Sequence, residues 1–113
     1  MSGVYYNDAI TTVGECGLHR VYGITKLVLP NVSTISLEGC YYMTDLEEVD
    51  IPKLQSLGNL AFYGCTKLKK VNGIENVTAL PRHAFYGCTA LESINLPNCT
   101  SVNSYAFYEC TAL

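Results

Sequence analysis

Six cysteines and two histidines are the side chains of this 113-residue chain that could act as nucleophiles or zinc ligands. The cysteines contain no pair two to four residues apart, the spacing that structural zinc sites use. Three of them instead recur inside one octapeptide, which reads AFYGCTKL at 61–68, AFYGCTAL at 84–91 and AFYECTAL at 106–113. Copies 23 and 22 residues apart indicate a structural repeat, not a catalytic or metal-binding cluster.

The repeat continues toward the N-terminus. Steps of 22 residues back from Ala61 reach Gly39 and Gly17 without a gap. The cysteine slot of the five aligned units holds Val21, Met43, Cys65, Cys88 and Cys110. The slot therefore takes small and medium apolar side chains, and free cysteine packs as one of these.

We predict that the cysteines are reduced, buried and therefore inert. Cys40 and Cys99 fit this interpretation, because they stand in slots that hold other apolar residues in the remaining units. Spacing alone would also permit disulfides between layers, since neighbouring strands lie about 4.8 Å apart and bridged Cα atoms about 4.4–6.8 Å apart. Parallel side-chain directions argue against such bridges. Cys16 falls in a column that is not apolar, so we expect it to be the most reactive thiol.

Two elements of each unit can be predicted from the spacing of apolar residues. The alternation Ile-x-Leu followed by proline, as in Leu-x-x-Ile-x-Leu-Pro at 91–97, predicts a short strand that the proline ends. The aligned strand columns are Leu27, Val49, Val71 and Ile94, then Leu29, Ile51, Ile74 and Leu96, with Gly73 inserted in the third unit. The octapeptide spaces its apolar residues by three, which predicts a helical or 3₁₀ turn on the opposite side.

We expect one domain over residues 1–113, with a degenerate N-terminal unit at 1–16 and regular repeats at 17–113. Ile10 and Val13 of the first unit fit apolar columns, and Tyr5 fits a strand column. One coil cannot bury its inner face alone. Stacked coils can, so the apolar columns should form a single continuous core.

The pattern LxxIxLPxxxxxIxxxAFxxCxxL, present as LESINLPNCTSVNSYAFYECTAL at 91–113, resembles the BspA-like, or Treponema-type, leucine-rich repeat. The resemblance covers 17–113. It implies an α/β repeat solenoid, a right-handed coil of about five 22–23-residue units with a parallel β-sheet on one face and short helical or 3₁₀ turns on the other. It also implies adhesion or binding of host and matrix proteins by surface proteins, with no catalytic residues and no cofactor.

Composition and charge limit the classes of partner that the chain is expected to bind. Hydrophobic residues make up 49% of the chain and charged residues 15%, which predicts a folded protein. No apolar run is long enough for membrane insertion, and no basic cluster exceeds Lys69–Lys70, which excludes nucleic acid as the expected partner. The N-terminus lacks the features of a secretion signal. We therefore expect a cytoplasmic protein if the chain is complete, and a surface or secreted one if it belongs to a larger protein.

Two surfaces are candidates for binding another protein. The third strand column, Val28, Asp50, Asn72 and Asn95, should face the concave side of the solenoid. The slot after Phe should form an exposed aromatic stripe of Tyr41, Tyr63, Tyr86 and Tyr108, widened by Tyr42. These rings could instead serve to shield the convex side. The alternating charges of Lys26, Glu48 and Lys70 should fix strand register.

The functional hypothesis is a non-catalytic protein-binding module. One alternative is a small phage- or mobile-element-encoded intracellular inhibitor that binds and occludes a specific enzyme. Another is a structural segment of a larger surface protein. Leu113 ends a unit in phase without a polar cap, so self-association through that end is a further expectation.

Overall fold

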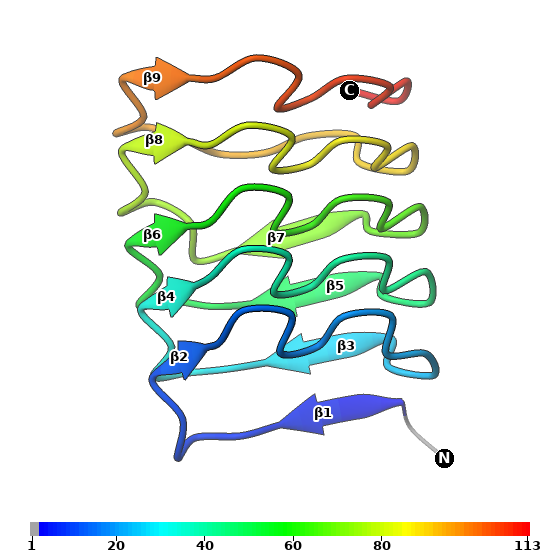
Figure 1. Ribbon diagram of the computed structural model, residues 1–113, viewed down its shortest axis with the longest axis vertical. Helices are drawn as coiled ribbons and strands as arrows, with labels where there is room; N and C mark the ends of the chain where they lie inside the picture. Colours follow the sequence, from blue (N-terminus) through cyan, green and yellow to red (C-terminus); the bar gives the residue numbers. More distant parts are fainter. Residues whose placement is uncertain (1–2) are drawn as a thin grey trace.

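The computed structural model describes residues 3–113, which form a stack of coils of about four turns (Figure 1). One parallel sheet has the order β1 (Val4–Tyr6), β3 (Lys26–Val28), β5 (Glu48–Asp50) and β7 (Lys70–Asn72). A second has the order β2 (Thr12–Val13), β4 (Thr34–Ile35) and β6 (Ser56–Leu57). A third pairs β8 (Ala79–Leu80) with β9 (Ser101–Val102).

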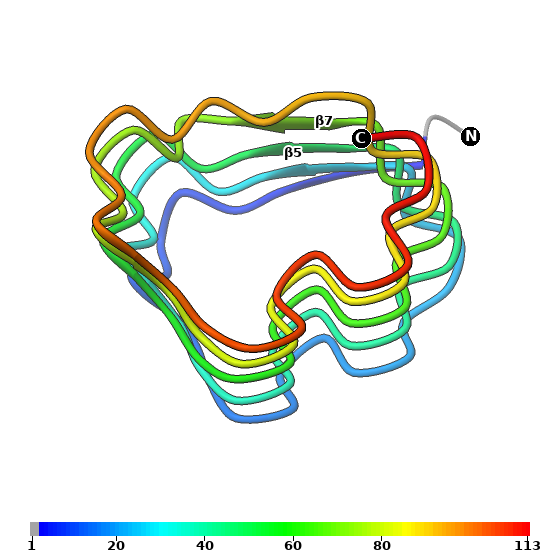
Figure 2. The same ribbon diagram turned by 90° about the horizontal axis from the view of Figure 1, so that it is seen from above.

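The strands pair in the register that the repeat predicts. Leu27 lies opposite Val49, and Val49 lies opposite Val71, so each strand is displaced by one unit from its neighbour. The first unit follows the same register, because Tyr5 lies opposite Leu27 and Val13 opposite Ile35. Seen along the stack, the coils superpose closely, which places equivalent slots above one another (Figure 2).

One predicted element is wrong, and another is not confirmed. Residues 91–96 were expected to form a strand, and the structure assigns none there. The inserted Gly73 ends β7 with a φ of 90°, and a Cβ at this position would come within 2.5 Å of the Cα of Pro52. Residues 91–96 would have to pair with β7, and Gly73 interrupts the strand there. Residues 91–96 also lie in the last coil, which can pair on one side only.

The octapeptide forms no helix. In residues 3–113, which the structure describes, its copies form consecutive turns. The reason lies in the direction of its backbone hydrogen bonds. Phe62 N–H donates to the Ala84 carbonyl of the next coil at 2.8 Å, whereas Tyr63 N–H donates to Leu60 within its own coil at 3.3 Å. Leu18, Cys40 and Phe85, in the same slot of other coils, also donate to the next coil. A helix would need every donor for bonds within the segment.

The core contains apolar and thiol side chains, and no polar or charged residue of 3–113 is buried. Phe62 stacks on Phe85 with ring centroids 5.3 Å apart, and Phe85 stacks on Phe107 at 5.8 Å. The predicted apolar slots are fully buried in the central coils. In the end coils the same slots are half-buried, as at Leu18 and Phe107.

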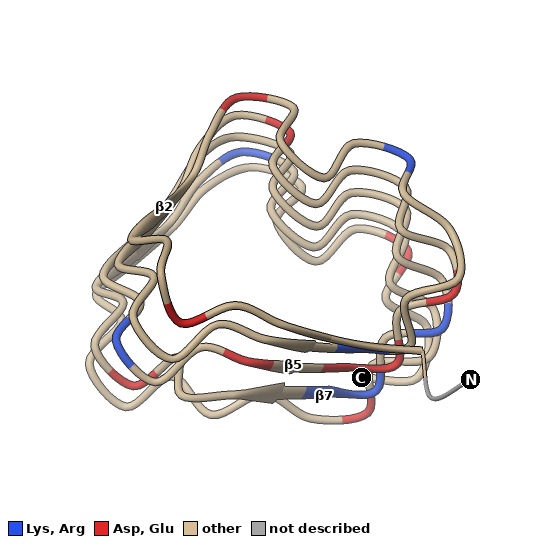
Figure 3. Ribbon diagram, turned by 90° about the horizontal axis from the view of Figure 1, so that it is seen from below, with Lys and Arg blue, Asp and Glu red and all other residues tan. Residues whose placement is uncertain are grey.

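Charged residues lie around the outside of the coils, and opposite signs meet on β5 and β7 (Figure 3). Glu48 lies opposite both Lys26 and Lys70, as the alternating column predicted. The Lys26 Nζ to Glu48 Oε2 distance is 3.5 Å. These side chains are partly exposed, so the pair contributes about 0–1 kcal/mol and mainly favours the correct register. Within 3–113 no helix could cross a membrane.

The Phe stack gives a test of the core. We expect Phe62→Ala to lower the free energy of unfolding by about 3–5 kcal/mol, because the ring is fully buried between two coils. Phe107→Ala is the matched control in the same slot of the half-buried last coil, and should cost clearly less. Urea unfolding followed by far-UV circular dichroism measures both. Equal losses would contradict a core that is tightest in the central coils.

Candidate functional site

The slot after Phe forms a continuous stack of rings, which we call the aromatic ladder: His19, Tyr41, Tyr63, Tyr86 and Tyr108. Successive centroids are 4.6, 5.1, 4.7 and 5.1 Å apart, and the interplanar angles are between 4° and 23°. The four tyrosines are brought together as the sequence predicted. His19 was missed, although it directly follows Leu18 and so lies in the same slot.

The expectation of an exposed stripe is wrong for most of the ladder. Tyr41, Tyr63 and Tyr86 are half-buried, whereas Tyr108 keeps 49% of its surface. Each inner ring is covered by the rings above and below it, because coils separated by one strand spacing bring equal side chains into stacking distance. The ladder therefore offers ring edges and hydroxyls to a partner while its faces stabilise the stack.

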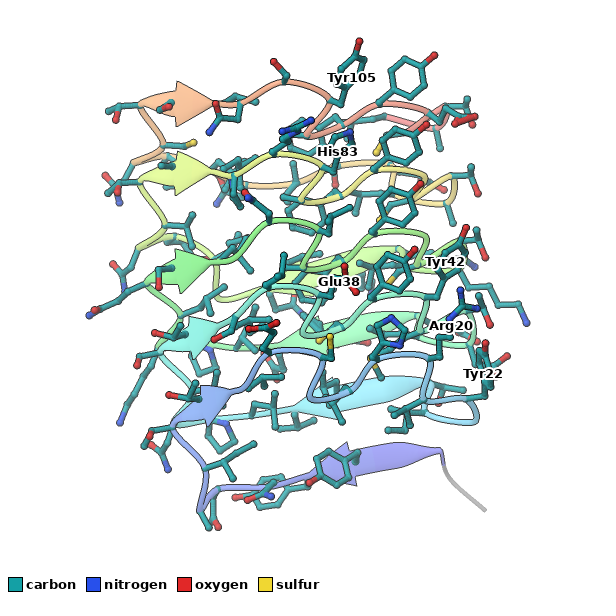
Figure 4. All side chains as sticks on the ribbon, in the orientation of Figure 1. Arg20, Tyr22, Glu38, Tyr42, His83 and Tyr105 are labelled. Atoms are coloured by element: carbon teal, nitrogen blue, oxygen red, sulfur yellow. The ribbon has the colours of Figure 1, made fainter. Side chains whose placement is uncertain are left out.

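Two columns of left-handed residues border the ladder. The first left-handed column is Cys16, Glu38, Leu60, His83 and Tyr105, with φ between 54° and 62°. The second left-handed column is Arg20, Tyr42, Gly64, Gly87 and Glu109, with φ between 52° and 76°. Glycine is the residue that suits this conformation, yet eight of the ten positions carry other side chains. Figure 4 shows Glu38, His83 and Tyr105 on one side of the rings and Arg20 and Tyr42 on the other.

The first left-handed column adds aromatic and ionic contacts to one side of the ladder. His83 stacks on Tyr105 at 5.4 Å, and Tyr105 meets Tyr108 edge to face at 5.2 Å. Lower in the stack, His19 Nε2 lies 3.3 Å from the Glu38 carboxylate. This side of the ladder is therefore filled by side chains in several coils.

In the second left-handed column, the lower coils carry the large side chains of Arg20 and Tyr42, and the next two coils carry Gly64 and Gly87. The Arg20 guanidinium carbon lies 4.9 Å from the centre of the Tyr42 ring and 5.7 Å from that of Tyr41. Tyr42 in turn meets Tyr63 edge to face at 5.6 Å. A Cβ at Gly64 would lie 2.8 Å from the Tyr42 ring, so this ring occupies the space that a side chain at 64 would need.

Above Tyr42 the surface is hollowed into a groove of about 210 Å³, which we call the glycine groove. Its lining consists of Tyr42, Tyr63, Gly64, Thr66, Tyr86, Gly87, Thr89 and Glu109. Desolvation raises the pKa of the Tyr86 hydroxyl, and the nearby Glu109 carboxylate raises it further. The groove thus joins ring edges, hydroxyls and one carboxylate on a glycine floor.

The predicted sheet column is brought together in part. Val28, Asp50 and Asn72 lie opposite one another on β3, β5 and β7. Asn95 lies outside the sheet, because 91–96 forms no strand. The Asn72 side-chain amide donates to Glu48 at 3.0 Å, so its polar group is already engaged within the face.

The buried cysteines are part of the hydrophobic core. Cys65, Cys88 and Cys110 are buried, and each thiol donates to the carbonyl of a residue in the Phe slot of the preceding coil, at 3.2, 3.2 and 3.0 Å respectively. All six cysteines are free, and Cys99 is half-buried instead of buried. Burial raises the pKa of the Cys65 thiol to about 12 and holds that of Cys88 well above its usual range.

Cys16 is exposed, as expected, but its predicted reactivity is opposed by its surroundings. Desolvation raises the pKa of this thiol, and the carboxylates of Glu38 and Glu15 raise it further. Less thiolate is therefore present at neutral pH than in an isolated cysteine. No group of three or more His, Cys, Asp or Glu side chains in the described part of the chain could hold a metal ion.

Comparisons with known proteins agree with this geometry. The family model described as "BspA type Leucine rich repeat region (6 copies)" matches residues 33–113. A crystal structure of a leucine-rich repeat protein from Eubacterium ventriosum is similar in fold, with a TM-score of 0.72 and 24% sequence identity. The similarity covers 92% of this chain and 35% of that protein, so the chain spans about a third of its length. No curated protein matches the sequence.

The buried thiols predict a loss of stability in alkali. Above pH 9.0, the usual thiol pKa, the unfolded chain releases thiol protons that the folded chain retains, so the free energy of unfolding falls as pH rises. Each thiol can contribute a slope of up to about 1.4 kcal/mol per pH unit. Urea unfolding of the protein and of a Cys65→Val/Cys88→Val variant should show a shallower decline in the variant. Parallel curves would mean that these thiols do not titrate differently on unfolding.

The two groove glycines form a matched pair. Gly64→Ala and Gly87→Ala both place a side chain at positive φ, which costs about 1 kcal/mol. Only Gly64→Ala also meets Tyr42, because a Cβ at Gly87 finds its nearest atom at 3.7 Å. We expect the Gly64 variant to lose about 1–3 kcal/mol more in urea unfolding. The difference should vanish when both are made with Tyr42→Ala, and its persistence there would contradict the contact.

Proposed function

Because the chain belongs to the BspA-type leucine-rich repeat family, we propose that it is a non-catalytic module that binds another protein through the aromatic ladder. Repeats of this family generally act as scaffolds for protein interaction. Adhesion, or recognition of a host or partner protein, is the finer function that we infer. The single observation that carries the choice of surface is the ladder of four stacked tyrosines.

The ladder has the properties of an interaction hot spot. Tyrosine is enriched in such sites because it offers a large apolar ring and a polar hydroxyl with few rotatable bonds. Stacking at 4.7–5.1 Å already fixes the rings of Tyr41, Tyr63, Tyr86 and Tyr108 in the free protein. Binding would therefore cost little additional side-chain entropy. Hydroxyls and ring edges remain available along the outer side.

The sheet column is the weaker candidate. Its neighbouring charges are paired within the face, as in Lys26 with Glu48, and Asn72 donates to Glu48. A partner would have to replace these contacts to use the charged groups. The column also ends at β7, because Asn95 leaves the sheet. We therefore assign the primary contact to the ladder and keep Val28, Asp50, Asn72 and Asn95 as the comparison surface.

Affinity capture tests this assignment. The protein is immobilised and exposed to a host-cell lysate and to an extract of matrix proteins, and the captured proteins are identified by mass spectrometry. A Tyr63→Ser/Tyr86→Ser/Tyr108→Ser variant should lose the captured partner, since loss of one hot-spot ring weakens binding by about 2 kcal/mol or more. Circular dichroism verifies that the variant is folded.

A Tyr6→Ser/Tyr22→Ser variant is the control, because both rings are highly exposed and lie outside the ladder. Its capture should equal that of the unchanged protein. A second comparison uses Asp50→Ala/Asn72→Ala on the sheet face. Capture that survives the ladder variant and disappears with the sheet variant would transfer the proposed site to the sheet.

A further inference from the structure

We propose that the glycine groove binds an arginine side chain of the partner protein, with the guanidinium placed against the tyrosine rings and the Glu109 carboxylate. The proposal rests on the proposed function, since it specifies the chemistry of one site on the ladder side of the molecule. Three observations support it: an arginine held against Tyr41 and Tyr42 two coils below Gly64, unfilled space over two glycines, and an acidic side chain at the groove.

The chain itself shows how this surface holds an arginine. Arg20 occupies the second left-handed column, and its guanidinium lies 4.9 Å from the Tyr42 ring centre and 5.7 Å from that of Tyr41. Both distances are within the range of a cation–π contact. A planar guanidinium can stack on a ring while its N–H groups remain free to donate. Beside the groove, Tyr63 and Tyr86 recur in the slot of Tyr41, and Tyr42 itself is part of the lining.

The place filled by Arg20 and Tyr42 in the first coils is vacant higher up. Gly64 and Gly87 hold the equivalent positions, and the nearest atoms to a Cβ at Gly87 are backbone atoms of Gly64 at 3.7 and 3.8 Å. Tyr63 and Tyr86 stand beside these glycines in the ladder, 4.7 Å apart and nearly parallel. A side chain from outside can therefore contact the groove-lining rings on the side that the chain's own side chains cover in the lower coils.

The polar groups of the groove favour a cation. The Glu109 carboxylate lines the groove near the Tyr86 hydroxyl, and its lone pairs can accept hydrogen bonds from a guanidinium. The Thr89 hydroxyl donates to the Thr66 carbonyl at 3.2 Å, which leaves its own oxygen able to accept. Lys67 is the neighbouring cation, and its Nζ is directed to Asp45 at 3.6 Å. The groove thus has acceptors and an unshared negative charge.

An aromatic side chain is the competing occupant, because Tyr42 fills the equivalent space beside Gly64. A ring would gain contact with Tyr63 and Tyr86 but would leave Glu109 without a cation. The charge of the chain, with ten acidic and seven basic residues, also favours a basic segment over an apolar one. We therefore commit to arginine and make the aromatic occupant an outcome of the test.

A peptide titration tests the inference without the biological partner. The ¹⁵N-labelled protein is titrated with Ac-Gly-Arg-Gly-NH₂, with its neutral citrulline analogue and with Ac-Gly-Tyr-Gly-NH₂. We expect the arginine peptide to shift the amide resonances of Gly64 and Gly87, and to bind at least about fivefold more tightly than the citrulline peptide. Added salt should weaken it. Equal binding of arginine and citrulline, or tighter binding of tyrosine, would overturn the proposal.

Three variants locate the binding. Glu109→Gln should weaken binding of the arginine peptide by about fivefold or more, whereas Glu92→Gln, an exposed carboxylate outside the groove lining, should leave it unchanged. Gly87→Tyr should block the groove, and thermal unfolding shows whether it folds. Equal losses in both Glu variants would mean a net-charge effect and reject the site. Capture of a partner that depends on Tyr63, Tyr86 and Tyr108, together with no arginine-specific shift, would reject this inference alone and leave the proposed function standing.

Discussion

The hydrogen bonds between successive coils are the constraint on which the rest of the structure depends. In the octapeptides at 61–68 and 84–91, alternate backbone N–H groups donate to the next coil, as from Phe62 to Ala84 and from Gly64 to Tyr86. These bonds keep neighbouring coils about one strand spacing apart. Equal slots then meet directly, so a ring stacks on a ring both in the core and on the surface. The core and the candidate site follow from the same spacing.

The thiols show how a backbone constraint selects a side chain. A turn that donates half of its N–H groups to the next coil leaves carbonyls that face the interior. The thiols of Cys65, Cys88 and Cys110 donate to such carbonyls while their sulfur atoms fill apolar space. Val21 and Met43 fill the same slot without a donor. Cysteine thus combines the volume that the core requires with a weak hydrogen bond, and this accounts for its recurrence better than redox chemistry does.

Much of this organisation could be predicted from the sequence, because a repeat constrains each slot several times. The register of β3, β5 and β7 and the alignment of Tyr5 and Val13 with the later coils follow from counting 22 residues. The helical or 3₁₀ turn is not confirmed, since a spacing of three describes consecutive turns as well as a helix. The half-burial of the tyrosines was missed because the stacking distance, not the residue type, determines it. His19 could have been found from its slot, whereas the contact of Arg20 with Tyr42 could not, because it depends on a backbone conformation that Arg does not indicate.

In the two left-handed columns, the side chains vary from coil to coil while the backbone conformation stays the same. Backbone φ stays between 52° and 76° at these positions whatever the residue, so the coil does not require a particular side chain there. A non-glycine residue in this conformation costs about 1 kcal/mol, and glycine would avoid that cost. Arg20, Tyr42 and Glu109 therefore introduce strain that the fold has no need of, in positions that border the ladder. Their side chains lie at the surface instead: Arg20 contacts aromatic rings, and Glu109 lines the glycine groove. Such a column can change its chemistry from coil to coil while the core beneath it is preserved, which is the property that a binding surface on a repeat protein requires.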